Sequence, residues 1–319
     1  MKRLSSLQFV LAAVLTMPAV ASAQVCYTAG DMPEATKESL QNAASQYLQD
    51  AQQGNSAVLQ QNAEFNLGAF VEEQKDLFTG QPTVRAIYLL DNSQPAAKQG
   101  RVEFYCGIFN SPHRVAFVFP DLPAGQYGVV VQDLPASKTP ATVTWILHQS
   151  GGWKIAGFYA KQKQIGGKDA DWYLNQARAF KAKGQTYNAW FYYVIADDLT
   201  RPFPALATPQ SDKLYDEMQA VKPGDLPVSG PTDLVVNGRT VKLTHISPIP
   251  VGDHLDLLVK YQTADVSDTG KAFQENMAVI KTLVTKYPQF REAFAGVVAR
   301  AVAPSGQDYG TLMAMKDVK

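Results

Sequence analysis

The chain has 319 residues, with 29 Lys and Arg against 29 Asp and Glu, and only 2 Cys. A length above about 200–250 residues favours two or more domains, and 46% apolar residues supply enough material for packed cores. Zero net charge argues against nucleic acid as a partner. Two cysteines are too few for a Cys-ligated zinc or iron–sulfur centre.

The first 23 residues have the pattern of a secretory signal peptide. Lys2 and Arg3 precede a short apolar stretch over residues 7–20, and Ala21-Ser22-Ala23 forms a small-x-small cleavage site. The apolar stretch is shorter than the ~20 residues needed to span a bilayer. We therefore expect cleavage after Ala23 and an exported protein, periplasmic or extracellular, that begins at Gln24 and has no transmembrane segment.

Export changes the interpretation of the two cysteines. In an oxidising compartment a lone pair of cysteines favours a disulfide, so we expect Cys26 to be bonded to Cys106. Such a bond closes a loop of about 80 residues and contributes about 3–4 kcal/mol in the chain-entropy model. The alternative is a nucleophilic Cys106 with His113 as its base, although no flanking motif supports it.

Residues 24–163 predict helices followed by an antiparallel meander. Residues 34–61 predict a helix with one apolar stripe formed by Leu40, Ala44, Tyr47 and Ala51. A second helix is expected over residues 67–77, with Phe70 and Leu77 facing inward. Strand-like runs follow, separated by turn residues, at 84–90, 101–109, 114–119, 127–132, 141–149 and 153–159.

The last two runs form a hairpin across Gly151-Gly152, with the sequence LHQSGGWKIAGFY. This order of elements and this closing hairpin resemble the nuclear-transport-factor-like cone fold that ketosteroid isomerases share. The resemblance covers about 130 residues and implies a helix-backed curved sheet with a concave pocket. It assigns no catalytic residue, because no position matches the family's catalytic Tyr and Asp.

Residues 161–168 are polar and contain two glycines, which predicts a linker before a helical region over 168–222. This region resembles a single tetratricopeptide unit, because small and aromatic residues occur at that family's spacing: Ala177, Phe180, Gly184, Ala189, Tyr193, Ala196 and Leu199. A third helix over 208–221 turns Leu214, Met218 and Val221 inward. One hairpin is too few for a solenoid, so we expect the segment to dock on a neighbouring domain.

A second linker is predicted over residues 222–231, followed by an α+β domain over 232–319. Asn237-Gly238 predicts a tight hairpin, and residues 255–262, 294–302 and 309–315 predict further strands. One amphipathic helix should cover one face of the sheet through Phe273, Met277, Ile280, Val284 and Tyr287. The whole chain is therefore expected to be α+β.

The chain contains few local chemical motifs. The four histidines, His113, His148, His245 and His254, have no metal-binding spacing, and no nucleotide-binding loop or nucleophile elbow occurs. We expect no cofactor and no metal. The aromatic residues remain as binding candidates: Tyr187 and Trp190 on the helical hairpin, and Trp145, Trp153 and Tyr159 on the cone-like domain.

Two classes of function follow from these observations. The first is a non-enzymatic binding or scaffolding protein that holds a protein or peptide partner in the cell envelope through the aromatic-rich hairpin and the curved sheet. The second is an isomerase- or hydrolase-like enzyme with its site in the concave pocket of residues 24–163, for which His148, Asp121 and Tyr105 are the candidate polar groups. The sequence favours the first class and leaves the second open.

Overall fold

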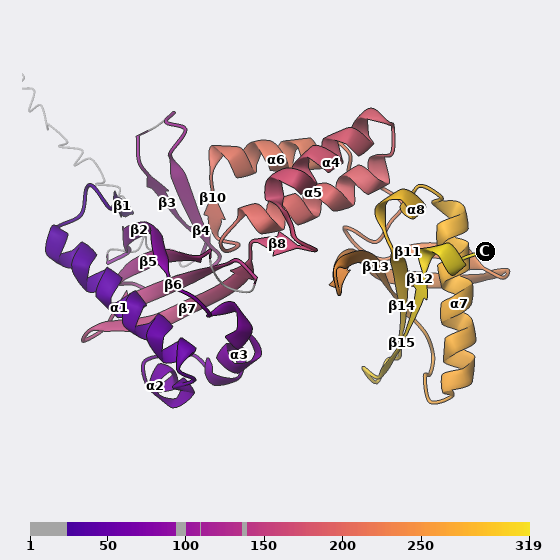
Figure 1. Ribbon diagram of the computed structural model, residues 1–319, viewed down its shortest axis with the longest axis horizontal. Coiled ribbons are helices and arrows are strands. Elements are labelled where there is room, and N and C mark those ends of the chain that lie inside the picture. The colour runs from indigo at the N-terminus through magenta and orange to yellow at the C-terminus, as the bar shows by residue number, and fades with distance from the viewer. Residues whose placement is uncertain (1–23, 94–99, 109, 136–138) are drawn as a thin grey trace, which may run out of the picture.

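The computed structural model describes residues 24–93, 100–108, 110–135 and 139–319 (Figure 1). The expected signal peptide, residues 1–23, lies outside the described residues. The described chain combines helices with mainly antiparallel sheets, and this confirms the predicted α+β class.

A five-stranded antiparallel sheet forms the centre of the N-terminal part, in the order β1-β2-β5-β6-β7. Its strands are β1 (Val25–Thr28), β2 (Thr83–Asp91), β5 (Gln126–Leu134), β6 (Ala141–Gln149) and β7 (Trp153–Gln162). One face is covered by α1 (Glu34–Gln52), α2 (Ser56–Gln61), α3 (Gly68–Glu73) and the 3-10 helix η1 (Lys75–Leu77). The α1 helix lies so close to the sheet that a side chain at Gly128 would collide with Leu40.

The predicted stripe of Leu40, Ala44, Tyr47 and Ala51 is buried against this sheet. Two expectations for the helices were wrong in detail. The helix predicted over 34–61 is broken after Gln52, because Gly54 adopts a left-handed φ of 73° and its N–H bonds back to α1.

The predicted inward position of Phe70 was also wrong. Leu77 is buried, but Phe70 is 38% exposed and makes an edge contact with Phe158 of the core. The short α3 helix ends at Glu73, so it offers only a narrow face to the sheet and Val71 occupies that face.

A three-stranded sheet, in the order β10-β4-β3, packs on the opposite face of the five-stranded sheet. It contains β3 (Val102–Cys106), β4 (Val115–Phe119) and β10 (Leu206–Ala207), and the last strand comes from the helical region. The predicted disulfide is confirmed: Cys26 of β1 is bonded to Cys106 of β3. The bond therefore joins the two sheets covalently.

The linker predicted over residues 161–168 was wrong, because the segment is regular structure. The β7 strand runs to Gln162, and β8 (Gln164–Ile165) pairs with β9 (Lys168–Asp169) around Gly166-Gly167. Both glycines have positive φ, 56° and 69°, as a tight two-residue hairpin requires. The polar side chains indicated solvent exposure and not the absence of strands.

Three helices follow: α4 (Ala170–Ala182), α5 (Thr186–Thr200) and α6 (Pro209–Gln219). The α5 helix is buried on nearly all sides, as its continuous apolar and aromatic sequence requires. Arg178 of α4 forms two 2.8 Å hydrogen bonds with Glu217 of α6, and Tyr193 of α5 donates to the same carboxylate. The Glu217 carboxylate therefore connects all three helices, through an ion pair to α4 and a hydrogen bond from α5.

The C-terminal part is a five-stranded sheet in the order β11-β12-β13-β14-β15 with α7 on one face. Its elements are β11 (Thr232–Val236), β12 (Arg239–Val251), β13 (His254–Gln262), α7 (Thr269–Lys286), α8 (Phe290–Ala293), β14 (Gly296–Val302), β15 (Asp308–Ala314) and the 3-10 helix η2 (Met315–Asp317). Asn237 and Gly238 both have positive φ, as the predicted hairpin turn requires. Strands β13 and β14 form a parallel pair and are connected through α7 and α8, whereas the other neighbouring strands of this sheet are antiparallel.

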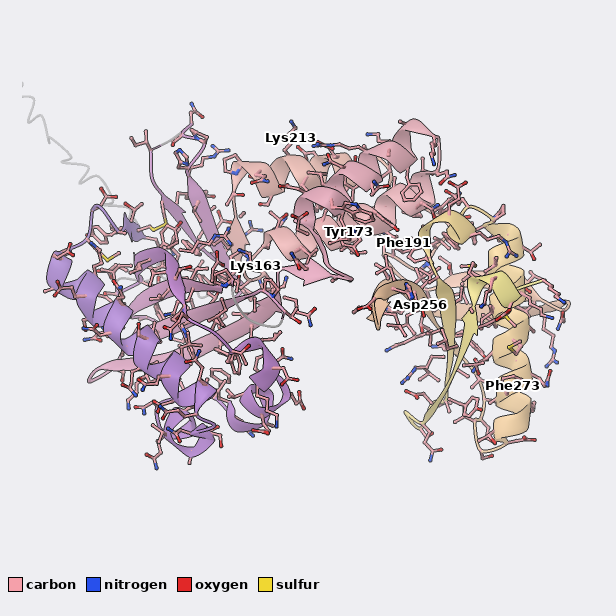
Figure 2. The ribbon with its side chains drawn as sticks, in the orientation of Figure 1. Lys163, Tyr173, Phe191, Lys213, Asp256 and Phe273 are labelled. Carbon is pink, nitrogen blue, oxygen red and sulfur yellow. A yellow bond between two sulfur atoms is a disulfide. The ribbon has the colours of Figure 1, made fainter. Side chains whose placement is uncertain are left out.

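The stripe predicted on α7 is partly wrong. Ile280, Val284 and Tyr287 are buried, but Phe273 is 39% exposed and lies at the outer edge of the molecule (Figure 2). Ala272 and Asn276 occupy the inward positions instead. The Asn276 amide donates to the Tyr309 carbonyl and to the Thr311 hydroxyl of β15, so hydrogen bonds determine the rotation of this end of the helix.

The helical region lies between the two sheet-containing parts and contacts both (Figure 1). Its α4–α6 side chains belong to the same hydrophobic core as the C-terminal sheet. On the other side, the loop between α5 and α6 places Phe203 in the core of the N-terminal part, and β10 pairs with β4. The region is therefore docked, as expected for a single helical hairpin, and it is docked on two neighbours.

Candidate functional site

The two aromatic residues predicted as binding anchors on α5 face the interior. Trp190 is only 7% exposed. The Tyr187 hydroxyl donates to Asp225 at 2.9 Å, and the ring centroid lies 5.0 Å from that of Tyr287. Tyr187 thus contributes to the junction with the C-terminal part, and Trp190 belongs to the core that the helical region shares with that part. A role of either residue in holding a partner stays a prediction.

The aromatic residues predicted on the cone-like domain occupy three environments. Trp145 is fully buried between Tyr47 and Phe158, and its Nε1 donates to Gln132 at 2.9 Å. These side chains fill the space between α1 and the sheet, where the cone-fold resemblance implies a concave pocket.

The remaining two are closer to the surface. Trp153 Nε1 donates to the Ser39 hydroxyl at 3.0 Å and so attaches β7 to α1. Tyr159 is half-buried on the opposite face of the sheet, with its ring 5.4 Å from that of Phe203. Tyr159 therefore helps to seat the loop between α5 and α6.

The three polar groups considered for an enzyme do not form one site. His148 Nδ1 lies 2.8 Å from the Glu64 carboxylate, and its ring stacks on Tyr127 at 4.7 Å. Burial, together with the charges of Glu64 and Asp121, raises the pKa of Tyr127. His148 and Asp121 thus share the surroundings of Tyr127, whereas Tyr105 is on the other sheet and donates to Glu103.

An apolar pocket of about 440 Å³ lies between the β3–β4 ribbon and the start of α6. Its lining comes from both sides: Tyr105, Cys106, Gly107, Arg114, Val115, Ala116, Ala207, Thr208, Pro209 and Asp212. Tyr105 is 71% exposed and Ile108, further along the ribbon, is 80% exposed. Two large apolar side chains therefore project into solvent beside an apolar cavity.

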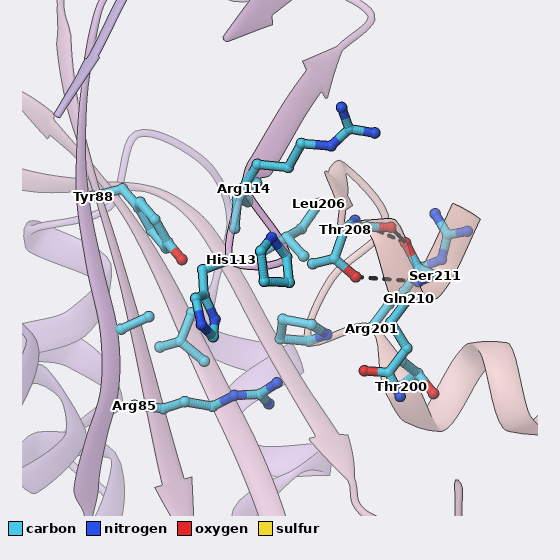
Figure 3. Close-up of a pocket in the computed structure, with 15 residues that line it drawn as sticks. Arg85, Tyr88, His113, Arg114, Thr200, Arg201, Leu206, Thr208, Gln210 and Ser211 are labelled. Carbon is cyan, nitrogen blue, oxygen red and sulfur yellow. Dashed lines mark hydrogen bonds between the residues drawn. The ribbon is translucent and has the colours of Figure 1, made fainter. Parts of the chain in front are cut away.

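A second, polar pocket of about 310 Å³ adjoins the first and shares Arg114, Val115 and Thr208 with it. Figure 3 shows Tyr88, His113 and Arg85 along one wall and Arg201 and Gln210 on the opposite side. We call this cavity the basic pocket, because three arginines and a histidine line it and no Asp or Glu does.

The electrostatics of the basic pocket are set mainly by the arginines. Arg201 Nε lies 2.9 Å from the Asp197 carboxylate, one turn earlier in the chain. Burial raises the pKa of Tyr88, and the nearby positive charge of Arg85 opposes that rise. The Tyr88 hydroxyl therefore stays protonated at neutral pH and can donate a hydrogen bond into the cavity.

Sequence reasoning did not find the basic pocket. Arg85 is on β2, His113 and Arg114 directly precede β4, and Arg201 follows α5, so more than a hundred residues separate the first from the last. No spacing rule connects residues that only the docking of a loop brings together.

Comparisons with family models, curated proteins and solved structures found no match to this chain. The likeness to the cone-fold and tetratricopeptide families therefore rests on element order and residue spacing alone. Among the described residues, no helix is long and apolar enough to cross a membrane. No group of three or more His, Cys, Asp and Glu in the same residues is arranged to hold a metal ion.

Proposed function

We propose that this chain is an exported, non-enzymatic binding protein that holds a peptide segment of a partner protein in the cell envelope. The observation that carries the proposal is the apolar pocket beside the exposed ring of Tyr105. Large exposed apolar side chains next to a cavity are typical of protein-interaction sites, and aromatic anchors dominate the energetics of such sites. The proposed occupant of the pocket is an apolar side chain of that segment.

The ribbon formed by strands β3 and β4 is attached on both sides of the pocket, and this supports the proposed role. Cys106 lines the pocket and is bonded to Cys26, and the pairing of β10 with β4 holds the opposite wall. A site that is ordered before binding loses less conformational entropy when its partner arrives. The disulfide also supports export, because such bonds persist in oxidising compartments.

The helical region supports a scaffolding role, because it connects the pocket to the C-terminal part. It shares a core with the C-terminal sheet and contributes Ala207 and Pro209 to the wall of the pocket. A partner bound at the ribbon would therefore lie next to both the N-terminal part and the helical region. We propose no reaction for this protein.

The test uses the mature chain from Gln24 and peptides selected from a random phage-displayed library. The affinity of each purified peptide is measured by calorimetry against the parent protein, Tyr105→Ala and the matched control Tyr215→Ala. Tyr215 is also an exposed tyrosine, at 47%, but it lies outside the pocket. We expect Tyr105→Ala to weaken binding by about tenfold or more, as loss of an anchor does, and the control to bind as the parent does. Equal affinities for all three proteins would refute the proposal.

A further inference from the structure

We infer that the basic pocket is a binding site for an oxyanion, the carboxylate or phosphate group of a small ligand. This inference goes beyond the proposed function, since it concerns the other cavity and does not need a protein partner. The charges of the side chains that line the basic pocket are unbalanced. Three arginines and His113 stand there without a single acidic side chain, in a chain whose formal net charge is zero.

Two of the three arginines lack the partner that normally neutralises them. Arg201 is paired with Asp197, but neither Arg85 nor Arg114 forms an ion pair with any carboxylate among the described residues. The undescribed residues contain no Asp or Glu, so none of them supplies a hidden carboxylate. An unneutralised guanidinium group in a cleft raises the local concentration of anions. Arg85 supplies that group beside Tyr88 and His113, whereas the Arg114 side chain lines the cavity and extends away from these three residues (Figure 3).

Guanidinium groups also match the chemistry of the proposed ligand. Each presents several N–H donors in a plane, and these bind two oxygens of a carboxylate or phosphate at once. Tyr88 adds a hydroxyl that donates no hydrogen bond to any described residue, and it faces the cavity beside His113 and Arg85 (Figure 3). The cavity volume of about 310 Å³ suits an anionic group with part of the molecule that carries it.

The start of α6 does not contribute to this inference. The Ser211 N–H donates to the Thr208 hydroxyl, and the Ser211 side chain bonds back to Thr208, so the capping groups already serve each other. The inference therefore depends on the side chains of β2, the turn before β4 and the loop after α5. Buried Pro202 and Leu206 hold that loop in the core and keep the walls in place.

The experiment titrates the mature chain with inorganic phosphate and, separately, with citrate, at low salt by calorimetry. The test variants are Arg85→Gln, at an exposed side chain, and the double variant Arg85→Gln/Arg114→Gln. Arg239→Gln is the matched control, because it removes the same charge from an exposed position in the C-terminal part. Circular dichroism checks that every variant is folded.

We expect saturable binding of at least one probe, weakened about tenfold or more in the double variant, as loss of charge-assisted hydrogen bonds predicts. Arg239→Gln should bind as the parent does. Preference for phosphate or for citrate identifies the group that the pocket takes. Absence of saturable binding for both probes, or binding that the double variant leaves unchanged, would overturn the inference. Tyr105→Ala should leave both titrations unchanged, so failure of the peptide-binding proposal is distinguishable from failure of this one.

Discussion

The Tyr192 hydroxyl donates a 2.8 Å hydrogen bond to the backbone carbonyl of Ala293, 101 residues further along the chain. Tyr192 is on α5 and Ala293 ends α8, so this bond crosses from the helical region to the C-terminal part. Burial raises the pKa of Tyr192 to about 12, because the phenolate would be poorly solvated there. The two parts therefore meet in a dry, packed interior.

Replacing Tyr192 with Phe should lower the free energy of unfolding by about 1–3 kcal/mol, because the buried Ala293 carbonyl loses its donor. Urea denaturation followed by circular dichroism measures the change. Tyr215→Phe is the control, since that side chain is exposed and should unfold as the parent does. An unchanged midpoint for Tyr192→Phe would contradict the buried hydrogen bond.

A fragment of residues 168–222 should not fold independently. The buried face of α5 packs against Phe290 and Phe294 of the C-terminal part, and the fragment would expose it to water. Thermal melting by circular dichroism should show a gradual loss of helix, whereas residues 168–319 should melt in one sharp transition. A cooperative melt of the short fragment would disprove the docking argument.

Replacing both Cys26 and Cys106 with Ala should lower the free energy of unfolding by about 3–4 kcal/mol, because the bond closes a loop of 80 residues in the unfolded chain. Denaturation of the parent with and without reductant measures the same quantity independently. Thiol labelling of the denatured, unreduced parent should find no free thiol. Two labelled cysteines would show that the disulfide is absent from the protein.

Asp256 is a buried carboxyl at the start of β13 (Figure 2), and burial raises its pKa above the usual range. A raised pKa in the folded state means that stability falls as pH rises through that value. Asp256→Asn should therefore be more stable than the parent at pH 7, and this advantage should disappear below the carboxyl's ordinary pKa. Unfolding curves at several pH values test this, and an Asn variant that is less stable at pH 7 would refute it.

Replacing Trp190 with Ala should destabilise the fold by about 3–5 kcal/mol, because the side chain is buried and its removal leaves a cavity. Urea denaturation measures this change. Loss of a partner by Trp190→Ala would not distinguish a missing binding contact from unfolding.

The Tyr187→Phe variant separates the two effects, because it keeps the ring and removes only the hydrogen bond to Asp225. If partner retention fails in that variant while the melting temperature stays near the parent value, Tyr187 has a direct role in binding.

Local patterns predicted local structure well. Asn237-Gly238 specified its hairpin, because few other residue pairs adopt positive φ in succession. The stripe from Leu40 to Ala51 specified which face of α1 is buried. Errors occurred where a distant partner decided the outcome: Asn276 bonds to β15 and turns Phe273 of α7 outward.

At the candidate sites, too, the sequence indicated the local residues but not their distant contacts. The aromatic side chains of α5 were conspicuous in the sequence, yet most of them form the joint with the C-terminal part. Aromatic density indicates a large apolar surface, and a sequence cannot say whether the chain itself or a partner covers that surface. The sequence did not indicate the exposed position of Tyr105, because a single aromatic residue is common in a strand and no cluster of aromatic residues like that of α5 surrounds it.

By itself the sequence determined the α+β class and most of the helices and strands, because period, turn chemistry and caps act within a few residues. The cysteine pairing also followed from it, since only one pair can form. Tertiary structure alone decided that the loop carrying Phe203 crosses into the N-terminal part and adds β10 to its second sheet. That docking brings Arg201 near Arg85 and Arg114 and creates both cavities. Contacts between residues more than a hundred positions apart depend on packing free energy, for which no short stretch of sequence carries a signal.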